Sequence, residues 1–528
     1  MHAPDPRIVF DLLTQLVGGA ALCIYFGAHS SLARPPSAAP NKASPVAGDD
    51  DDYEYDDDEA DDEGDPALQA GLDASDAILL PLISALVLYG LYCLIMYLDD
   101  PEILNKIVRG YMSLVSLASI AGTYTQLLLL ATNLVFPRFW RARGGSVYEA
   151  RQDIKAHVPL GPAGPGAPQA FLLGPLPVGL RAAHCGALGD ALWALRGRLT
   201  QKWMVRLRLR AGGAVAREKG VVQVQHVVAG LLSMATVAAY QMTNATALSN
   251  IIAVSLCHMT FTVLSPTTFV VGSMILTGLF FYDIIMVFYT PLMLTVASKL
   301  DAPVKLVASA GGKSGSMLGL GDIVLPGIMI SMALRFDLWR HYHAKTKYET
   351  VPLMRTLADG TTEVAAQRTM ATKPRYISVA HKWGDWLWTA SFGRSADVPV
   401  ALAGATFAKT YFAAAMVGYT LGLVAAMGFM LVFRHGQPAL LYLVPAVLAA
   451  VWGTGWARSE IGLMLKYTED GSLDTKEQIV EVDEQGRPVQ QKQDDEEEKK
   501  KKTARETKDD KEVFVFSITE MVRKQRTA

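Results

Sequence analysis

The sequence predicts an all-α membrane protein, a bundle of about nine transmembrane helices. The chain has 528 residues, of which 51% are apolar and only 19% are charged. The apolar residues are gathered into long runs, each with enough residues to cross a hydrocarbon core of about 30 Å. Since that core holds no water to satisfy free backbone groups, each run is expected to be helical. This pattern excludes a soluble two-domain protein.

Nine apolar runs follow one another along the chain. They are Ile8–Ala28, Ile78–Leu98, Tyr111–Phe136, Val221–Met242, Ala247–Leu264, Phe269–Ala297, Met317–Leu334, Tyr411–Phe433 and Ala439–Trp456. The first run resembles a cleavable signal sequence in length, but its positive flank is weak, because Arg7 is set against Asp5 and Asp11. We therefore expect a retained first helix.

The segments between the runs differ in charge. An acidic block, Asp49–Asp65, repels itself and should be disordered, and a short apolar patch in the tail, Val513–Val522, is interpreted as an interfacial or partner-binding helix. The predicted organisation is 1–75 first helix and acidic segment, 76–136 second and third helices, 137–220 basic Pro/Gly-rich insertion, 221–335 fourth to seventh helices, 336–408 basic loop, 409–456 last two helices, and 457–528 charged, largely disordered tail.

The basic segments predict the orientation of the bundle. Lysine and arginine near the ends of spans favour the cytosolic side, and both basic loops follow odd-numbered spans. With nine spans, these loops and the C-terminus face the cytosol and the N-terminus faces the lumen. The loop 298–316 is then lumenal, although it contains three lysines.

Two aspartates lie inside apolar runs. Asp283 stands in FFYDIIMVFY, within the sixth run, and Asp322 stands in LGLGDIVLPG, within the seventh. An isolated carboxylate at such depth costs about 2.5 to 3.5 kcal/mol on insertion scales. Because consecutive spans joined by a short connection are usually neighbours, the two acids are expected to meet.

Paired acids of this kind have a known chemistry. Two like charges in a medium of low dielectric cannot both ionise, so one carboxyl keeps its proton and the other stays charged. Such a pair activates water and polarises a peptide carbonyl in aspartic proteases. It also suits a proton- or cation-coupled transporter, and the residues alone leave both functions open. No cysteine or histidine cluster has metal-ligand spacing, and no metal or other cofactor is predicted.

Three motifs, in order, resemble the signal peptide peptidase family. They are Tyr282-Asp283, then Gly319-Leu320-Gly321-Asp322, then Gln437-Pro438-Ala439-Leu440 at the start of the last span. The resemblance extends over the helical pattern from Ile78 to Trp456. It implies an intramembrane aspartic protease, more distantly related to presenilin.

The resemblance also implies roles and partners. Asp283 and Asp322 would be the catalytic pair, with Tyr282 beside it. Gly319, Leu320 and Gly321 would shape the substrate approach, and Gln437, Pro438, Ala439 and Leu440 would border the site. Substrates would be transmembrane segments of type II orientation, such as leftover signal peptides, in the membrane of the endoplasmic reticulum. A homo-oligomer, or a scaffold role in degradation machinery, stays open, and no nucleic-acid partner is predicted.

This chain also departs from the family pattern. The insertion 137–220 and the acidic block have no obvious counterpart, and the C-terminal RKQRTA lacks the two-lysine retention signal of many members. The prediction of an endoplasmic reticulum location therefore depends on the family resemblance and not on a retention signal.

Overall fold

The structure is a computed structural model of the chain. It describes residues 6–39, 54–55, 70–97, 101–142, 146–161, 164–167, 169, 186–211, 214–290, 292, 295–296, 305–310, 313–356, 362–374, 376–378, 382–389, 406–433, 437–469, 514–520 and 522–523. Most of the acidic block and most of the tail after Trp456, where disorder was predicted, lie outside these residues.

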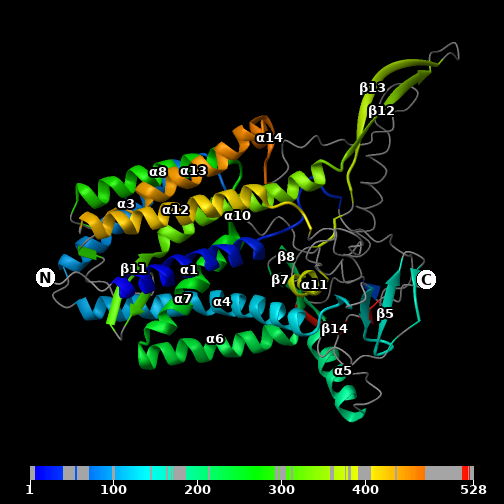
Figure 1. The fold of residues 1–528 in the computed structure, drawn as a ribbon, viewed down its shortest axis with the longest axis horizontal. Helices are drawn as coiled ribbons and strands as arrows, with labels where there is room; N and C mark the ends of the chain where they lie inside the picture. The colour runs from blue at the N-terminus through cyan, green and yellow to red at the C-terminus, as the bar shows by residue number, and fades with distance from the viewer. Residues whose placement is uncertain are drawn as a thin grey trace.

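Over each of the nine apolar runs, the described residues form a helix. These helices are α1 (Pro6–Ser30), α3 (Asp76–Tyr97), α4 (Pro101–Val135), α6 (Val224–Thr243), α7 (Thr246–Val263), α8 (Phe269–Phe288), α10 (Leu320–His343), α12 (Thr410–Phe433) and α13 (Leu440–Ala457). They run side by side as one bundle (Figure 1). Within the described part of the chain, all of them except α6 and α10 are long and apolar enough to count as candidate membrane spans, which makes seven. The fold is a multi-pass helical membrane protein, and the count of nine spans stays a prediction.

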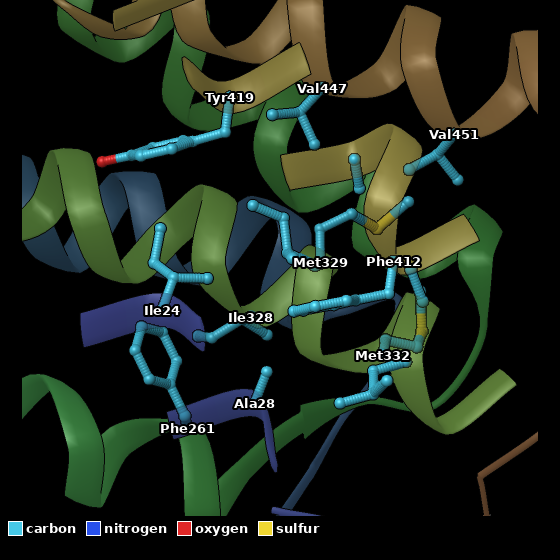
Figure 2. Close-up of a cluster of buried hydrophobic side chains, with 14 of the residues drawn as sticks. Ile24, Ala28, Phe261, Ile328, Met329, Met332, Phe412, Tyr419, Val447 and Val451 are labelled. Atoms are coloured by element: carbon cyan, nitrogen blue, oxygen red, sulfur yellow. The ribbon is translucent and has the colours of Figure 1, made fainter. Parts of the chain in front are cut away.

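The interior of the bundle is held by close packing of α1, α7 and α10. Phe261 of α7 is fully buried and lies between Gly27 of α1 and Gly327 of α10, where any added Cβ atom would collide with its ring. Figure 2 shows this ring beside Ile24 and Ile328. Packing of this density leaves little room for larger residues at the two glycines.

Helices α12 and α13 pack through small residues. A Cβ atom added at Gly418 would lie 2.7 Å from the Ala446 carbonyl oxygen, and one at Gly422 would lie 3.0 Å from the Ala446 Cβ atom. Small residues of this kind let two membrane helices approach closely. The approach places the start of α13 against the rest of the bundle.

The seventh helix continues beyond its predicted end. The apolar run ends at Leu334, but α10 continues to His343, so Arg335 and Arg340 both lie in the helix, and Arg340 is not in the basic loop 336–408 where we expected it. Tertiary ion pairs explain the difference. Arg335 Nε lies 2.9 Å from Glu469 Oε1, and Arg340 Nη1 lies 2.8 Å from Glu460 Oε2.

The chain also contains strands, which the all-α prediction omitted. Hairpins are formed by β10 (Lys305–Ala310) with β11 (Lys313–Gly319) and by β12 (Lys347–Thr356) with β13 (Thr362–Thr372). The insertion forms a sheet of β3 (Phe139–Arg141), β4 (Val147–Arg151), β5 (Ala156–Gly161) and β6 (Gly164–Pro165), and then helix α5 (Gly186–Thr200). Short pairs join β2 (Ala70–Leu72) to β9 (Leu264–Pro266) and β1 (Glu54–Tyr55) to β15 (Val522–Arg523).

The apolar patch in the tail is a strand, so the predicted helix is wrong. Strand β14 (Phe514–Glu520) pairs antiparallel with β7 (Trp203–Ala211), which also pairs with β8 (Ala214–Val222). The patch alternates apolar and polar residues over Phe516, Ser517, Ile518 and Thr519, a period of two that favours a strand. Two short helices, α11 (Trp383–Thr389) and α14 (Ile461–Lys466), complete the described elements.

The additional elements lie mainly at one end of the bundle. Figure 1 shows β11 at the end near the N-terminus, whereas α5, α11, β5, β7 and the β12–β13 hairpin lie at the other end. The two helices that carry the predicted acids, α8 and α10, extend between these ends. Their acids lie toward the β10–β11 end.

Candidate functional site

Asp283 lies inside the bundle, on the last third of α8. Asp283 is only 5% exposed, and its neighbours are apolar residues of α8, α10 and α13. The backbone N–H of Leu440 donates to Asp283 Oδ2 at 3.3 Å. This bond joins the sixth-run acid to the first residue of α13, so two of the three predicted motifs are in direct contact.

Asp322 lies in the first turn of α10, one residue after Gly321. The Gly319 backbone hydrogen-bonds to its carboxyl group, and the charge of Asp283 acts on that carboxyl group as well. Asp322 is half-buried, whereas Asp283 is buried. The structure thus brings the two predicted acids near enough to interact, one on each of two packed helices.

The two glycines before Asp322 leave one side of the site open. Both are exposed, and a Cβ atom added at Gly321 would meet no atom within 4 Å. A Cβ atom at Gly319 would lie 3.4 Å from Asp322 Oδ2, which is ordinary contact. The φ of Gly319 is −65°, so its backbone conformation does not require glycine. What the glycines provide is space beside the acid.

The other predicted residues surround this pair. Tyr282 and Leu320 are partly buried and pack against the main apolar core. Pro438 is buried, Ala439 is half-buried, and Gln437 Oε1 accepts a hydrogen bond from the Tyr442 hydroxyl at 2.9 Å. Gln437 therefore fixes the entry into α13.

Two further residues hold the site, and the sequence analysis missed both. Tyr419, fully buried in α12, donates from its hydroxyl to the backbone oxygen of Asp322 at 3.4 Å. Asn250 of α7 pairs with the backbone of Val307 in β10, accepting from its N–H at 2.9 Å and donating to its carbonyl at 2.8 Å. Since β11 runs directly into α10, Asn250 anchors the hairpin that leads to Asp322. Each is one of several polar residues within an apolar run, so the sequence held no signal that distinguished it.

The site contains carboxyl, amide and hydroxyl groups of protein side chains. Among the described residues, no group of three or more histidine, cysteine, aspartate or glutamate residues is placed to hold a metal ion. No cation of the described part of the chain forms an ion pair with Asp283 or Asp322. Two neighbouring acids without a cation are suited to sharing a proton.

Comparison with known proteins identifies a family for this chain. A family model described as signal peptide peptidase matches residues 64–471. A probable intramembrane protease of Schizosaccharomyces pombe is 30% identical over 232 residues, covering 44% of this chain and 59% of that protein. Intramembrane protease 2 of Caenorhabditis elegans is 32% identical over 243 residues, covering 44% and 41%. The signal peptide peptidase of Mus musculus is 30% identical over 210 residues, covering 38% and 39%.

These relatives extend beyond the matched parts, and the chain spans about half the length of the curated relatives it matches. The family model, in contrast, covers most of this chain and includes all three motifs. Seven helices of the described residues are long and apolar enough to span a membrane. The chain is a multi-pass membrane protein, and it belongs to the signal peptide peptidase family.

Proposed function

We propose that this chain is an intramembrane aspartic endopeptidase that uses Asp283 and Asp322 as its catalytic pair. The observation that carries the proposal is the placement of two acids on neighbouring helices, buried Asp283 on α8 and Asp322 at the start of α10, in a site open beside Gly321. The names of the relatives, intramembrane protease and signal peptide peptidase, support the same class of reaction.

The pair acts as one acid–base unit. The ionised carboxylate takes a proton from a water molecule while the water oxygen bonds to the scissile carbonyl carbon. The protonated carboxyl gives its proton to the carbonyl oxygen, which forms a tetrahedral diol. When the carbon–nitrogen bond breaks, the newly protonated carboxyl gives its proton to the leaving nitrogen and the other carboxylate takes a proton from a diol hydroxyl, so the pair again holds one proton. Because the two carboxyl groups titrate together, neither step is assigned to one aspartate.

The surroundings orient the two acids. The Leu440 N–H holds one oxygen of Asp283, and the Gly319 backbone holds the Asp322 carboxyl. Tyr419 of α12 donates to the Asp322 backbone oxygen and so holds the start of α10. Preorganised donors of this kind spare the reaction the cost of ordering the groups.

The substrate is a transmembrane segment that unwinds locally at the site. A peptide bond in a helix is shielded by its own hydrogen bonds, so the scissile carbonyl must leave the helix to reach the acids. The open side at Gly319 and Gly321 accommodates an extended backbone there. With a lumenal N-terminus, the site suits segments of type II orientation, such as leftover signal peptides, in the endoplasmic reticulum membrane.

The test is cleavage of a reporter transmembrane peptide by purified protein in detergent. Wild type should cleave it, and Asp283→Asn and Asp322→Asn should each lower the rate by about 10³-fold or more. Asp337→Asn is the matched control. Asp337 is also buried on α10, but it accepts from the Phe412 N–H at 3.0 Å and belongs to another cluster. Its activity per folded molecule should equal that of wild type.

Two results would contradict the proposal. Equal cleavage by wild type and both asparagine variants would remove the acids from catalysis. Proton-dependent uptake by wild type in vesicles, without cleavage, would assign the paired acids to transport.

A further inference from the structure

Helix α5 of the insertion carries a stripe of leucines along one side. Leu188, Leu192, Leu195 and Leu199 recur at helical spacing, so they share one face of the helix. Leu188 is 59% exposed and Leu195 is 46% exposed. The buried face of the helix, with Trp193 and Arg196, lies about a quarter turn away from the stripe. An exposed apolar stripe on a helix that is packed along its neighbouring face indicates a surface that contacts something else.

The buried face of α5 packs on the insertion sheet and fixes the helix rigidly. Arg196 Nη1 donates to Gln152 Oε1 at 2.9 Å, and Gln152 Nε2 donates to the Trp193 carbonyl at 2.8 Å. The rings of His157 and Trp193 lie 5.4 Å apart between their centroids. The leucine stripe is therefore held in one direction relative to the sheet.

The C-terminal end of α5 is tied to the ends of two bundle helices. Gln225, in the first turn of α6, donates from Nε2 to the Leu199 carbonyl at 2.7 Å and to Thr132 Oγ1 of α4 at 3.1 Å. Figure 1 shows one end of α5 beside this end of α6, with the rest of α5 projecting past the edge of the bundle. The C-terminal end of the leucine stripe thus lies where α4 ends and α6 begins.

Two observations place the edge of the hydrocarbon layer at this level. On α6, Val227 is already 58% exposed, two residues after Gln225, or about 3 Å along the helix axis. Beside the end of α4, Trp388 Nε1 donates to the Leu134 carbonyl at 2.9 Å, and Trp386 of the same short helix is 47% exposed. Exposed tryptophans at the end of a span are typical of the headgroup region.

The strands that follow α5 are rich in basic residues, and in the β7–β8 register Arg206 is paired with Lys219 and Arg208 is paired with Arg217. Basic residues beside a bilayer favour anionic headgroups, which complements an apolar contact with the acyl chains.

We propose that α5 is an in-plane membrane helix whose leucine stripe, Leu188, Leu192, Leu195 and Leu199, lies in the acyl-chain boundary of the leaflet at this end of the bundle. The insertion is then a membrane-resting domain and not a freely solvated loop. This proposal is independent of the catalytic assignment.

The test uses single-cysteine labels in reconstituted protein. Cys93 and Cys185 are replaced by alanine, while Cys23 and Cys257 are buried and stay. Leu188→Cys and Leu195→Cys carry a small fluorophore, and Asp190→Cys, on the other edge of α5, is the matched control. Full-length protein is placed in phosphatidylcholine vesicles whose acyl chains carry bromine, which quenches only nearby fluorophores.

Labels at 188 and 195 should be quenched about threefold or more relative to the label at 190, and they should resist quenching by iodide in water. Equal acyl-chain quenching at all three positions, or strong iodide quenching at 188 and 195, would overturn the proposal. Shielding at 188 and 195 that disappears when the protein is diluted in the vesicles would overturn it as well, because the stripe would then contact a second copy of the chain.

Discussion

The two ends of α10 differ in whether their charged residues have partners of opposite charge. At its start, Asp322 lies near a second acid, and within the described residues neither acid pairs with a cation. Near its other end, Arg335 is buried and has three partners: Glu469 Oε1 at 2.9 Å, Ser31 Oγ at 2.8 Å and Ser265 Oγ at 2.6 Å. One end keeps reactive groups uncompensated, and the other compensates its charge fully.

This difference separates function from stability along one helix. Buried charges that are paired and hydrogen-bonded hold segments together, whereas uncompensated ones cost free energy and persist at functional sites. Arg335 joins the end of α1, the α7–α8 connection and the chain after α14. Removing a group at this end should therefore affect folding, and removing one at the other end should affect catalysis.

The largest expected effect on stability is that of Arg335→Ala. It leaves Glu469 and two serine hydroxyls without their partner, which costs about 3 to 5 kcal/mol when a buried pair is broken. Glu469 keeps some solvent contact, with 16% of its side chain exposed, so we expect the lower part of that range. The free energy of unfolding, measured by dodecyl sulfate titration in mixed micelles, checks this.

Arg458→Ala is the matched control for Arg335→Ala. Arg458 also pairs with a glutamate, Glu460, at 3.1 Å, but 43% of its side chain is exposed. Its loss should cost about 0 to 1 kcal/mol. If both variants lose the same free energy, the contrast between the ends of α10 is wrong.

Asn250→Ala should produce an intermediate effect at the catalytic end. The substitution removes both bonds to the Val307 backbone, so the β10–β11 hairpin loses an anchor and Asp322 can shift. A displacement of about 1 Å in a catalytic group can cost up to about 10²-fold in rate. We expect kcat to fall about 10- to 100-fold with KM little changed, measured on the reporter peptide.

Two variants sharpen the Asn250 prediction. Asn250→Asp keeps the acceptor for the Val307 N–H but loses the donor to its carbonyl, so its kcat should lie between those of wild type and Asn250→Ala. Asn244→Gly, at the turn before α7, is the control. Asn244 contacts Arg109 and has a φ of 51°, which glycine adopts freely. A change in KM without a fall in kcat would contradict an anchoring role for Asn250. An equal fall in kcat in the Asn244→Gly control would contradict it as well.

The membrane fold could be predicted from sequence because the bilayer permits few solutions. Each apolar run had to be helical, and the nine helices of the described residues lie over the nine runs. The end of α10 could not be predicted in this way. Arg335 and Arg340 are charged, and only the partners Glu469 and Glu460, more than a hundred positions away, make them compatible with a buried helix.

The strands show a second limit of sequence reasoning. The segment before Asp322 is rich in glycine and serine and was expected to be a loop, but tertiary contact with Asn250 accompanies its pairing as a hairpin. In the tail, the ten-residue apolar patch was interpreted as a helix although its residues alternate. The strand with which it pairs, β7, lies in the distant insertion. Pairing between distant segments is a property of the fold and leaves little local trace.

The site itself was predictable to the extent that chemistry appears in single residues. Asp283 and Asp322 stand out because acids are rare in apolar runs. Tyr419 and Asn250 carry polar groups that suit many roles in a membrane bundle, such as helix–helix hydrogen bonds. Their contacts with the Asp322 backbone and with the hairpin depend on how α7 and α12 pack, which the sequence did not specify.

The smallest expected effect is on the stability of the Asp283→Asn variant, which we expect to be catalytically inactive. Asparagine keeps an oxygen that can accept from the Leu440 N–H and removes a buried ionisable group that no cation of the described residues compensates. Its free energy of unfolding should therefore be unchanged or higher by up to about 1 kcal/mol. The same dodecyl sulfate titration measures it beside Arg335→Ala. A loss as large as that of Arg335→Ala would mean that Asp283 holds the bundle together, and the division of α10 into a reactive and a structural end would fail.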